Sequence, residues 1–245
     1  MKRRIVIAII LLKLLKIIAR KVPMSVDAQP RWFDAQAIGT ALERETAPDA
    51  AELRDILNKS LELQPLSMAE TVALMRVQDG VGVGRIMAAA DEVKQKVYGD
   101  RIVLSAPLHI SNHCGSECLY CANRKSNKAV ERKYMTSPEM REAALKLIRQ
   151  GHKRIFLVSG QLPNADIEYL AEAISILYTA FDGVGEVHSV NVNVGALESH
   201  EYAALLESYV GTVLIYQDTY HEACYRAAHI SGPKSDYYAR LNAAD

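Results

Sequence analysis

Cysteine is scarce in this chain, and its scarcity excludes one class of protein. Only four cysteines occur among 245 residues, of which 49% are hydrophobic. Small secreted domains compensate for a thin core with many disulfides, whereas a chain of this length and composition can bury a sizeable core of its own. Three cysteines stand within eight positions and Cys224 lies far downstream, which does not fit a disulfide framework. We therefore expect free thiols in a reducing, cytoplasmic setting.

The chain also lacks a net charge, although its charges are unevenly placed. Lys and Arg together number 29, as do Asp and Glu. Residues 1–23 hold seven of the basic residues and no acidic one, so the remainder carries 22 basic against 29 acidic residues, a net charge of −7. Such a body has no general positive field for a phosphate backbone. Non-specific nucleic-acid binding is therefore not expected.

Residues 1–23 lack the unbroken apolar run that a membrane span needs. A span takes about 20 apolar residues, and Lys13 and Lys16 interrupt this run. No small-residue cleavage site follows, which disfavours a secretory signal. On a helix, Lys13, Lys16 and Arg20 would share one stripe beside a wide Ile/Leu surface, typical of an interfacial helix on anionic lipid. We expect either such a basic leader in contact with a membrane surface or translated sequence upstream of a start at Met24.

Residues 24–99 are expected to form a polar lead-in and a small helical region. Apolar residues at helical spacing predict a helix over 50–63, and Ser67 with Glu70 forms a capping box that opens a second helix. The stretch "DGVGVGR" at 79–85 resembles a phosphate loop. No strand precedes it, however, and Arg85 stands where the fingerprint has a glycine. We interpret residues 79–85 as a linker between helices.

From residue 100 to residue 245, short strands alternate with amphipathic helices. We expect strands over residues 103–111, 154–160, 187–195 and 212–219, separated by helices that begin near Ser137, Ile167 and Glu198. Short, regular units of this kind predict parallel strands with right-handed crossovers. Both an open doubly wound sheet and a closed barrel satisfy the pattern.

The side chains of the third expected strand help to choose between the two architectures. Val190, Val192 and Val194 alternate with Asn191 and Asn193, whereas the strands of a doubly wound sheet are apolar on both faces. We therefore predict a partial TIM-type (β/α) barrel of about four βα units. A full barrel has eight units, so we expect a fragment of a longer protein whose first and last strands are open edges.

A cysteine motif follows the first expected strand. Cys114, Cys118 and Cys121 form C-x3-C-x2-C. Three thiolates can ligate three irons of a [4Fe-4S] cluster and leave the fourth iron open to a chelating amine and carboxylate, and barrel chemistry lies at the C-terminal ends of the strands. A structural zinc site that recruits the nearby His109 or His113 is the alternative, with Cys224 remote in the sequence. A purely structural thiol cluster is a further alternative.

These residues resemble a known superfamily. C-x3-C-x2-C with the aromatic Tyr120 before the third cysteine resembles the signature of radical S-adenosylmethionine (SAM) enzymes. From about residue 50 onward, the stretches "RIVLSAPLHISNHC", "CLYCANRKSNK" and "GPKSDYYARL" resemble the tyrosine lyases of [FeFe]-hydrogenase maturation. The thiazole-forming tyrosine lyases of thiamin synthesis are the nearest relatives of that family.

The resemblance implies a reaction. Such enzymes bind SAM on the open iron, cleave it with an electron from a donor such as ferredoxin or flavodoxin, and break the Cα–Cβ bond of L-tyrosine to give p-cresol and dehydroglycine. In the maturases a second cluster, in a C-terminal domain absent from this sequence, makes CO and cyanide from dehydroglycine. A catalytically silent fragment that only binds a metal cluster is the alternative.

The resemblance also implies roles for individual residues, although it assigns no catalytic one. Cys114, Cys118 and Cys121 would hold the cluster. The expected SAM contacts are Tyr120 for the adenine, Ser159, Gly160 and Gln161 for the methionine amine, Asp218 for the ribose, Lys234 for the methionine carboxylate, and Asn193. The family usually has Glu at the position of Gln161, and a neutral amide loses the charge assistance that roughly doubles the strength of such a bond.

Several nearby residues are interpreted without a role in binding. We expect Cys224 to be a buried, small apolar residue and His221 and His229 to be loop histidines. The basic side chains near the cysteines are expected to form a solvated loop that screens the charge of the cluster; they are Arg124, Lys125, Lys128, Arg132 and Lys133.

Overall fold

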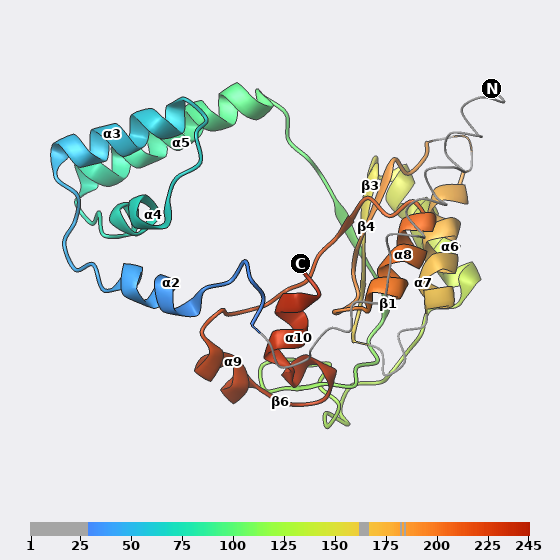
Figure 1. Ribbon diagram of the computed structural model, residues 1–245. Helices are drawn as coiled ribbons and strands as arrows, with labels where there is room; N and C mark the ends of the chain where they lie inside the picture. Colours follow the sequence, from blue (N-terminus) through green and yellow to red (C-terminus); the bar gives the residue numbers. More distant parts are fainter. Residues whose placement is uncertain (1–28, 162–166, 182, 184) are drawn as a thin grey trace, which may run out of the picture. The chain divides into compact units, whose positions relative to one another are not determined.

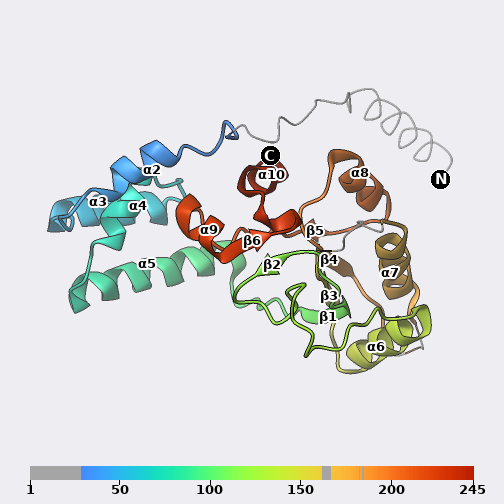
Figure 2. The ribbon, with the colours of Figure 1, turned by 90° about the horizontal axis from the view of Figure 1, so that it is seen from below.

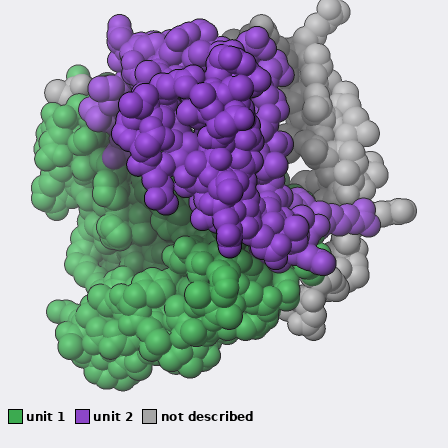
Figure 3. All heavy atoms as spheres, turned by 90° about the vertical axis from the view of Figure 1, so that its left-hand side faces the viewer, with its two compact units in different colours: residues 1–30, 106–245 green, residues 31–105 purple. Residues whose placement is uncertain are grey.

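The computed structural model describes residues 29–161, 167–181, 183 and 185–245 (Figure 1). The basic leader predicted at residues 1–23 lies outside the described residues. The chain divides into a helical unit, Arg31–Ser105, and a second unit that contains Ala106–Asp245 (Figure 3). Among the described residues, no helix has both the length and the apolar character needed to cross a membrane.

The helical unit is built from α2 (Ala35–Leu42), α3 (Ala50–Leu61), α4 (Met68–Met75) and α5 (Gly80–Tyr98). The predicted capping box is present, because the Ser67 hydroxyl accepts from the Glu70 amide while the Glu70 carboxylate accepts from the Ser67 amide. Leu53 and Leu57 of α3 pack on Ala89 of α5 to form a small core.

The interpretation of residues 79–85 as a linker is wrong, because α5 begins at Gly80. The side chain of Asp79 caps the helix, with its Oδ1 accepting from the Gly82 amide at 2.8 Å. Each glycine costs a helix about 1 kcal/mol relative to alanine. The cap and the burial of Ala89 against α3 offset that cost, and tertiary packing of this kind is invisible to a search for glycine-rich loops.

The second unit contains a four-stranded parallel sheet within its described residues. The strands are β1 (Ala106–Ser111), β3 (Arg154–Ser159), β4 (Ser189–Asn193) and β5 (Thr212–Val213), and they neighbour each other in that order. Helices α6 (Ser137–Arg149), α7 (Ile167–Thr179) and α8 (Ser199–Glu207) lie along one side of the sheet (Figure 2). Sequential parallel strands joined by helices on one side are part of a (β/α) barrel. The predicted fold class is confirmed.

The alternation of the strands places the core on the helix side. Val190 and Val192 are fully buried, as are Ile155 and Leu157 of β3. They pack with the apolar stripes of the three helices, which include Met140, Ala144, Ile148, Leu170, Ala173, Ile174, Leu177 and Leu205. Asn191 and Asn193 project from the other face and are only half-buried. The polar face predicted from β4 is therefore the face that lines a barrel interior.

The chain after β5 departs from the predicted βα repeat. The expected strand over 212–219 stops at Val213, and the chain continues through α9 (Glu222–Ala228), β6 (His229–Ser231), the 3-10 helix η1 (Pro233–Ser235) and α10 (Tyr237–Asn242). Strand β6 pairs antiparallel with β2 (Glu117–Cys118), which contains the second cysteine of the motif. This pairing joins positions more than a hundred residues apart, which explains why local patterns missed it.

Candidate cluster and cofactor site

The three cysteines are free thiols on a loop that leaves the C-terminal end of β1. Cys118 is buried in β2, and Cys114 and Cys121 are half-buried. Two successive turns shape the motif, since the Cys121 amide donates to the Cys118 carbonyl at 3.0 Å and the Arg124 amide donates to the Cys121 carbonyl at 3.2 Å. The Asn123 amide donates to Cys121 Sγ at 3.3 Å. Burial raises the pKa of the Cys118 thiol, partly offset by the charge of Lys234.

The C-terminal segment holds the outer side of this loop. The Leu119 amide donates to the Ala228 carbonyl at 2.9 Å, and the Lys234 amide donates to the buried Ser116 hydroxyl at 2.9 Å. Gly232 has φ +85° and approaches so closely that a Cβ there would lie 2.7 Å from Ser116 Cα. Only glycine combines that backbone angle with that approach.

The end of β3 holds the inner side of the loop. The Gly160 amide donates to the Ser111 carbonyl at 3.2 Å, and the Gly115 amide donates to the Gln161 carbonyl at 2.9 Å. A Cβ on Gly160 would overlap the His113 carbonyl oxygen and lie 2.9 Å from Cys114 Cβ. The strand end and the cysteine loop are therefore in direct backbone contact.

A cavity of about 190 Å³ opens beside the cysteines. It brings together nine of the predicted site residues: Cys114, Cys118, Cys121, Tyr120, Ser159, Gly160, Gln161, Asn193 and Lys234. Sequence reasoning gave no ligand role to Asn123, Tyr216 or Arg240, which also line it. Asp218 is not in the lining but is ion-paired with Lys234 at 2.6 Å.

Two buried polar groups of the cavity lack hydrogen-bond partners among the described residues. Gln161 Oε1 accepts no bond, and Arg240 Nε donates none. Arg240 is only 3% exposed, and its Nη2 donates to the Tyr216 carbonyl. An unpaired buried polar group costs about 1–3 kcal/mol. Both residues line the cavity, so these two unpaired atoms belong to its wall.

Four side chains form a network at the wall of the cavity. Tyr120 Oη lies 2.8 Å from His229 Nε2 and 3.2 Å from Lys234 Nζ, and Asp218 Oδ2 lies 3.4 Å from His229 Nε2. Burial opposes ionisation of Asp218, but the hydrogen bond and charge of Lys234 outweigh it and lower the pKa of that carboxyl group. Burial, reinforced by the Asp218 charge, raises the pKa of Tyr120. Tyr120 is therefore held as a neutral phenol by its surroundings.

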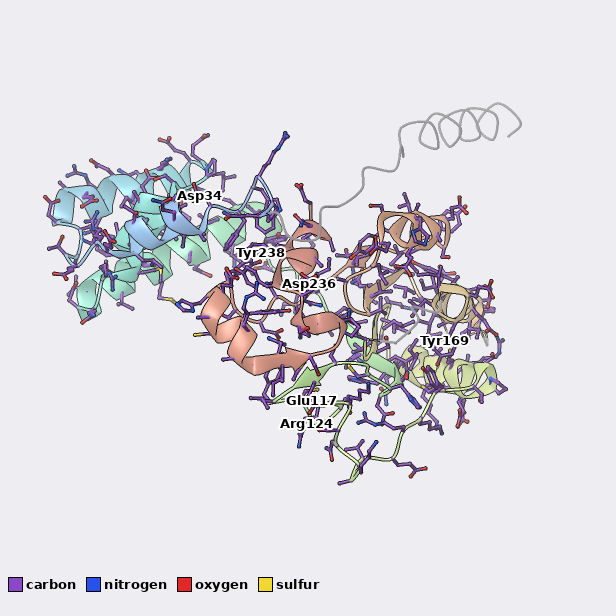
Figure 4. All side chains as sticks on the ribbon, turned by 60° about the horizontal axis from the view of Figure 1, so that its bottom comes forward. Asp34, Glu117, Arg124, Tyr169, Asp236 and Tyr238 are labelled. Carbon is purple, nitrogen blue, oxygen red and sulfur yellow. The ribbon has the colours of Figure 1, made fainter. Side chains whose placement is uncertain are left out.

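Three interpretations of residues near the site are wrong. His229 is 2% exposed rather than a loop histidine, and its Nδ1 donates to the Tyr225 carbonyl at 2.7 Å. Cys224 is exposed rather than buried. The basic loop is not uniformly solvated, because Arg124 pairs with Glu117 at 3.6 Å (Figure 4) and Arg132 bonds to backbone carbonyls of the loop.

The arrangement of possible metal donors near the cysteines bears on the zinc alternative. Within the described ranges, no three His, Cys, Asp or Glu side chains converge on a point where one metal ion would sit. A zinc ion needs such convergence, whereas a cubane cluster places each cysteine sulfur on a different iron. His113 stacks on Tyr134 with ring centroids 4.3 Å apart, and Cys224 is exposed on α9. His109, by contrast, lines the same cavity as the three cysteines.

A half barrel with three free thiols at the end of its first strand, beside a polar cavity, defines a class of cluster-dependent barrel proteins. The family model of the radical SAM superfamily matches residues 108–245, more than half of the chain. The chain belongs to the radical SAM superfamily.

Comparison with individual proteins shows which members of the superfamily this chain resembles. A crystal structure of HydG, a maturase of the [FeFe]-hydrogenase, superposes with a TM-score of 0.85 at 32% identity and covers 89% of this chain and 48% of that one. The 2-iminoacetate synthase of Escherichia coli K12 is 25% identical over 88% of this chain and 54% of its own length. The [FeFe] hydrogenase maturase subunit HydE of Thermotoga maritima is 28% identical over 77% of this chain and 51% of its own. The chain spans about half the length of these relatives.

Proposed function

We propose that this chain holds a [4Fe-4S] cluster on Cys114, Cys118 and Cys121 and binds SAM in the adjoining cavity, as part of a radical SAM carbon–carbon lyase that acts on L-tyrosine. The observation that carries the proposal is the pair of unpaired buried groups, Gln161 Oε1 and Arg240 Nε, in the cavity that the cysteines line. The similarity to HydG and to a 2-iminoacetate synthase supports the substrate, because 2-iminoacetate is another name for dehydroglycine.

When bound, the cluster and SAM would supply an adenosyl radical that takes a hydrogen atom from tyrosine, after which the Cα–Cβ bond of tyrosine would break. The protein's part is to bind and orient. Gln161 Oε1 would accept from the methionine ammonium, and Arg240 would face the methionine carboxylate. The family resemblance assigns that carboxylate to Lys234, but the charge of Lys234 is already compensated by Asp218. Arg240 is therefore the stronger candidate.

The remaining cavity residues would shape the rest of the SAM site. Tyr120 would lie against the adenine, and Asp218 would reach the ribose hydroxyls from behind Lys234. Ser159 donates its hydroxyl proton to the Gly160 carbonyl at 2.8 Å, which orients the end of β3 beside the cavity. Asn193 presents an amide from β4 to the cavity. A ferredoxin- or flavodoxin-type electron donor and a reducing compartment complete the proposal, and the four free cysteines are compatible with such a compartment.

Anaerobic reconstitution with iron and sulfide tests the cluster. The protein should turn brown and bind iron and sulfide in the ratio of one [4Fe-4S] cluster per chain. Cys118→Ala should lose the cluster, whereas Cys224→Ala, which removes an exposed thiol elsewhere, should keep it. Zinc in place of iron on elemental analysis would support the zinc alternative instead.

Incubation of the reduced, cluster-loaded protein with SAM and tyrosine tests the chemistry. We expect 5′-deoxyadenosine and p-cresol above a protein-free control. A loaded protein that makes neither product would support the silent alternative. 5′-Deoxyadenosine without p-cresol would retain the radical chemistry and exclude tyrosine as the substrate. The thiazole-forming lyases of thiamin synthesis also cleave tyrosine, so the same products are expected from either lyase family.

A further inference from the structure

Arg132 lies eleven residues beyond the last cysteine of the motif, yet its guanidinium group contacts the backbone on both sides of the motif. Nη1 donates to the Asn112 carbonyl at 2.6 Å and to the Asn123 carbonyl at 3.1 Å. Nη2 donates to the Arg124 carbonyl at 2.7 Å and to the Asn127 carbonyl at 3.2 Å. Each terminal nitrogen therefore bonds two carbonyls, and the half-buried guanidinium closes the loop around the cysteines.

The backbone around Arg132 is itself fixed to the start of the loop. The Asn112 side chain donates to the Glu131 carbonyl at 2.7 Å and accepts from the Lys133 amide at 2.7 Å. The two neighbours of Arg132 in the chain are thus bonded to the residue whose carbonyl Arg132 also binds. This double attachment fixes the direction of the guanidinium group.

Asn123 connects this arrangement to a cluster ligand. Its carbonyl accepts from Arg132, and its own amide donates to Cys121 Sγ at 3.3 Å. A hydrogen bond to a cysteine sulfur stabilises the more negative, reduced state of an iron–sulfur cluster and so raises its reduction potential. A residue that fixes Asn123 therefore affects the cluster without touching it.

We propose that Arg132 is a positioning residue that sets the reduction potential of the cluster by holding the Asn123 amide against Cys121 Sγ. This inference rests on the proposed function, because it requires the cluster to be bound at the cysteines. It predicts that the shape of the guanidinium group matters as well as its charge. An ammonium group offers three donors from one nitrogen and cannot serve four carbonyls from a flat fork.

The test compares Arg132→Lys, Arg132→Gln and Lys128→Gln. Lys128 is the matched control, because it is an exposed cation of the same loop without a hydrogen bond or ion pair to any described residue. In iron-free protein, hydrogen exchange of the Asn123, Arg124 and Asn127 amides should accelerate about tenfold in both Arg132 variants. It should not change in Lys128→Gln, and exchange in β3 and β4 should not change in any variant.

In cluster-loaded protein, a potentiometric titration followed by electron paramagnetic resonance gives the second result. Both Arg132 variants should have a more negative potential than the parent chain, and Lys128→Gln should match the parent. A potential lowered equally by Arg132→Gln and Lys128→Gln, with Arg132→Lys unchanged, would overturn the inference in favour of charge alone. Asn112→Ala removes only the side-chain bonds that fix the backbone next to Arg132. It should therefore change the hydrogen exchange and the reduction potential in the same direction as the Arg132 variants, but by less.

The two measurements separate this inference from the proposed function. Failure of the parent chain to take up iron would reject the proposed function and, with it, the effect of Arg132 on the potential. Unchanged exchange and unchanged potential in the loaded Arg132 variants would reject the inference and leave the proposed function intact.

Discussion

Lys234 Nζ lies 2.6 Å from Asp218 Oδ2, and this ion pair joins the chain just after β5 to the 3-10 helix η1. Both side chains are largely shielded, at 18% and 31% exposure. Asp218 has φ +67°, a left-handed conformation that costs a residue other than glycine roughly 1 kcal/mol or more. The ion pair with Lys234 holds Asp218 in this conformation.

The ion pair predicts a double-mutant cycle. Lys234→Met should destabilise the iron-free protein by about 1 kcal/mol, because it removes the cationic partner of a partly shielded Asp218 carboxylate. Adding Asp218→Asn should recover part of that loss. The midpoint and slope of urea unfolding measure each free energy of unfolding. Equal and additive losses in the two single variants would show that the pair contributes nothing.

Gly160 predicts a steric effect on the cysteine loop. Gly160→Ala should destabilise the protein by roughly 1–3 kcal/mol, because the new methyl group overlaps the His113 carbonyl and neither backbone is free to move. Gly84→Ala is the control, since no atom lies within 4 Å of a Cβ there and the position is helical. That control should raise stability by about 0.5–1 kcal/mol. Thermal unfolding of both variants distinguishes overlap from the simple loss of a glycine.

Replacing Gln161 by Glu should tighten SAM binding, because it introduces the negative charge that the family usually has at this position. Gln161→Glu would place a carboxylate where the unpaired Oε1 now lies. A charge-assisted bond to the methionine ammonium should improve affinity by about 1 kcal/mol, or roughly fivefold. Anaerobic calorimetry with the cluster-loaded protein measures the change. If SAM bound equally well to Gln161→Glu and Gln161→Ala, the amide would have no part in the site.

Glu139 predicts a pH-dependent stability. It completes the capping box of α6 with Thr136, and a hydrogen bond from Lys133 together with those from Thr136 lowers its pKa from 4.5 to about 2. Because the folded-state pKa is depressed, the stabilisation is present above pH 4.5 and is lost as the pH falls toward 2.

Glu139→Gln should therefore lower the Tm by roughly 2 °C at pH 7, and the difference from the parent chain should narrow below about pH 4.5. Calorimetric scans from pH 7 down to pH 3.5 provide the comparison. A difference that stays constant over this range would show that the carboxylate charge is not involved.

The sequence was sufficient to predict the features that depend on residues close together in the chain. The alternation of Val and Asn in β4 follows from the two-residue period of a strand, and it predicted which face is buried. The capping box at Ser67 involves residues three positions apart. The cysteine motif is equally local, and the cavity beside it contains nearly all the residues that the family resemblance indicated.

The residues whose roles could not be predicted from the sequence are placed by long-range contacts with the backbone. Arg132 is one basic residue among several near the cysteines, and nothing in the sequence marks it as the one that bonds four carbonyls. Arg240 lines the cavity because α10 follows β6, and β6 pairs with β2 across a long interval. Since carbonyl partners belong to every residue type, no local pattern records them.

The pairing of β2 with β6 also determines the order of events during synthesis. The cysteines leave the ribosome well before His229 and Lys234, whose backbones form the outer wall around Ser116 and Leu119. Chains emerge from their N-terminus, and a contact between distant segments waits for the later one. A nascent chain therefore displays its thiols in an unenclosed loop until α9 and β6 arrive. Insertion of iron is expected to follow the release of this segment rather than to accompany translation of the motif.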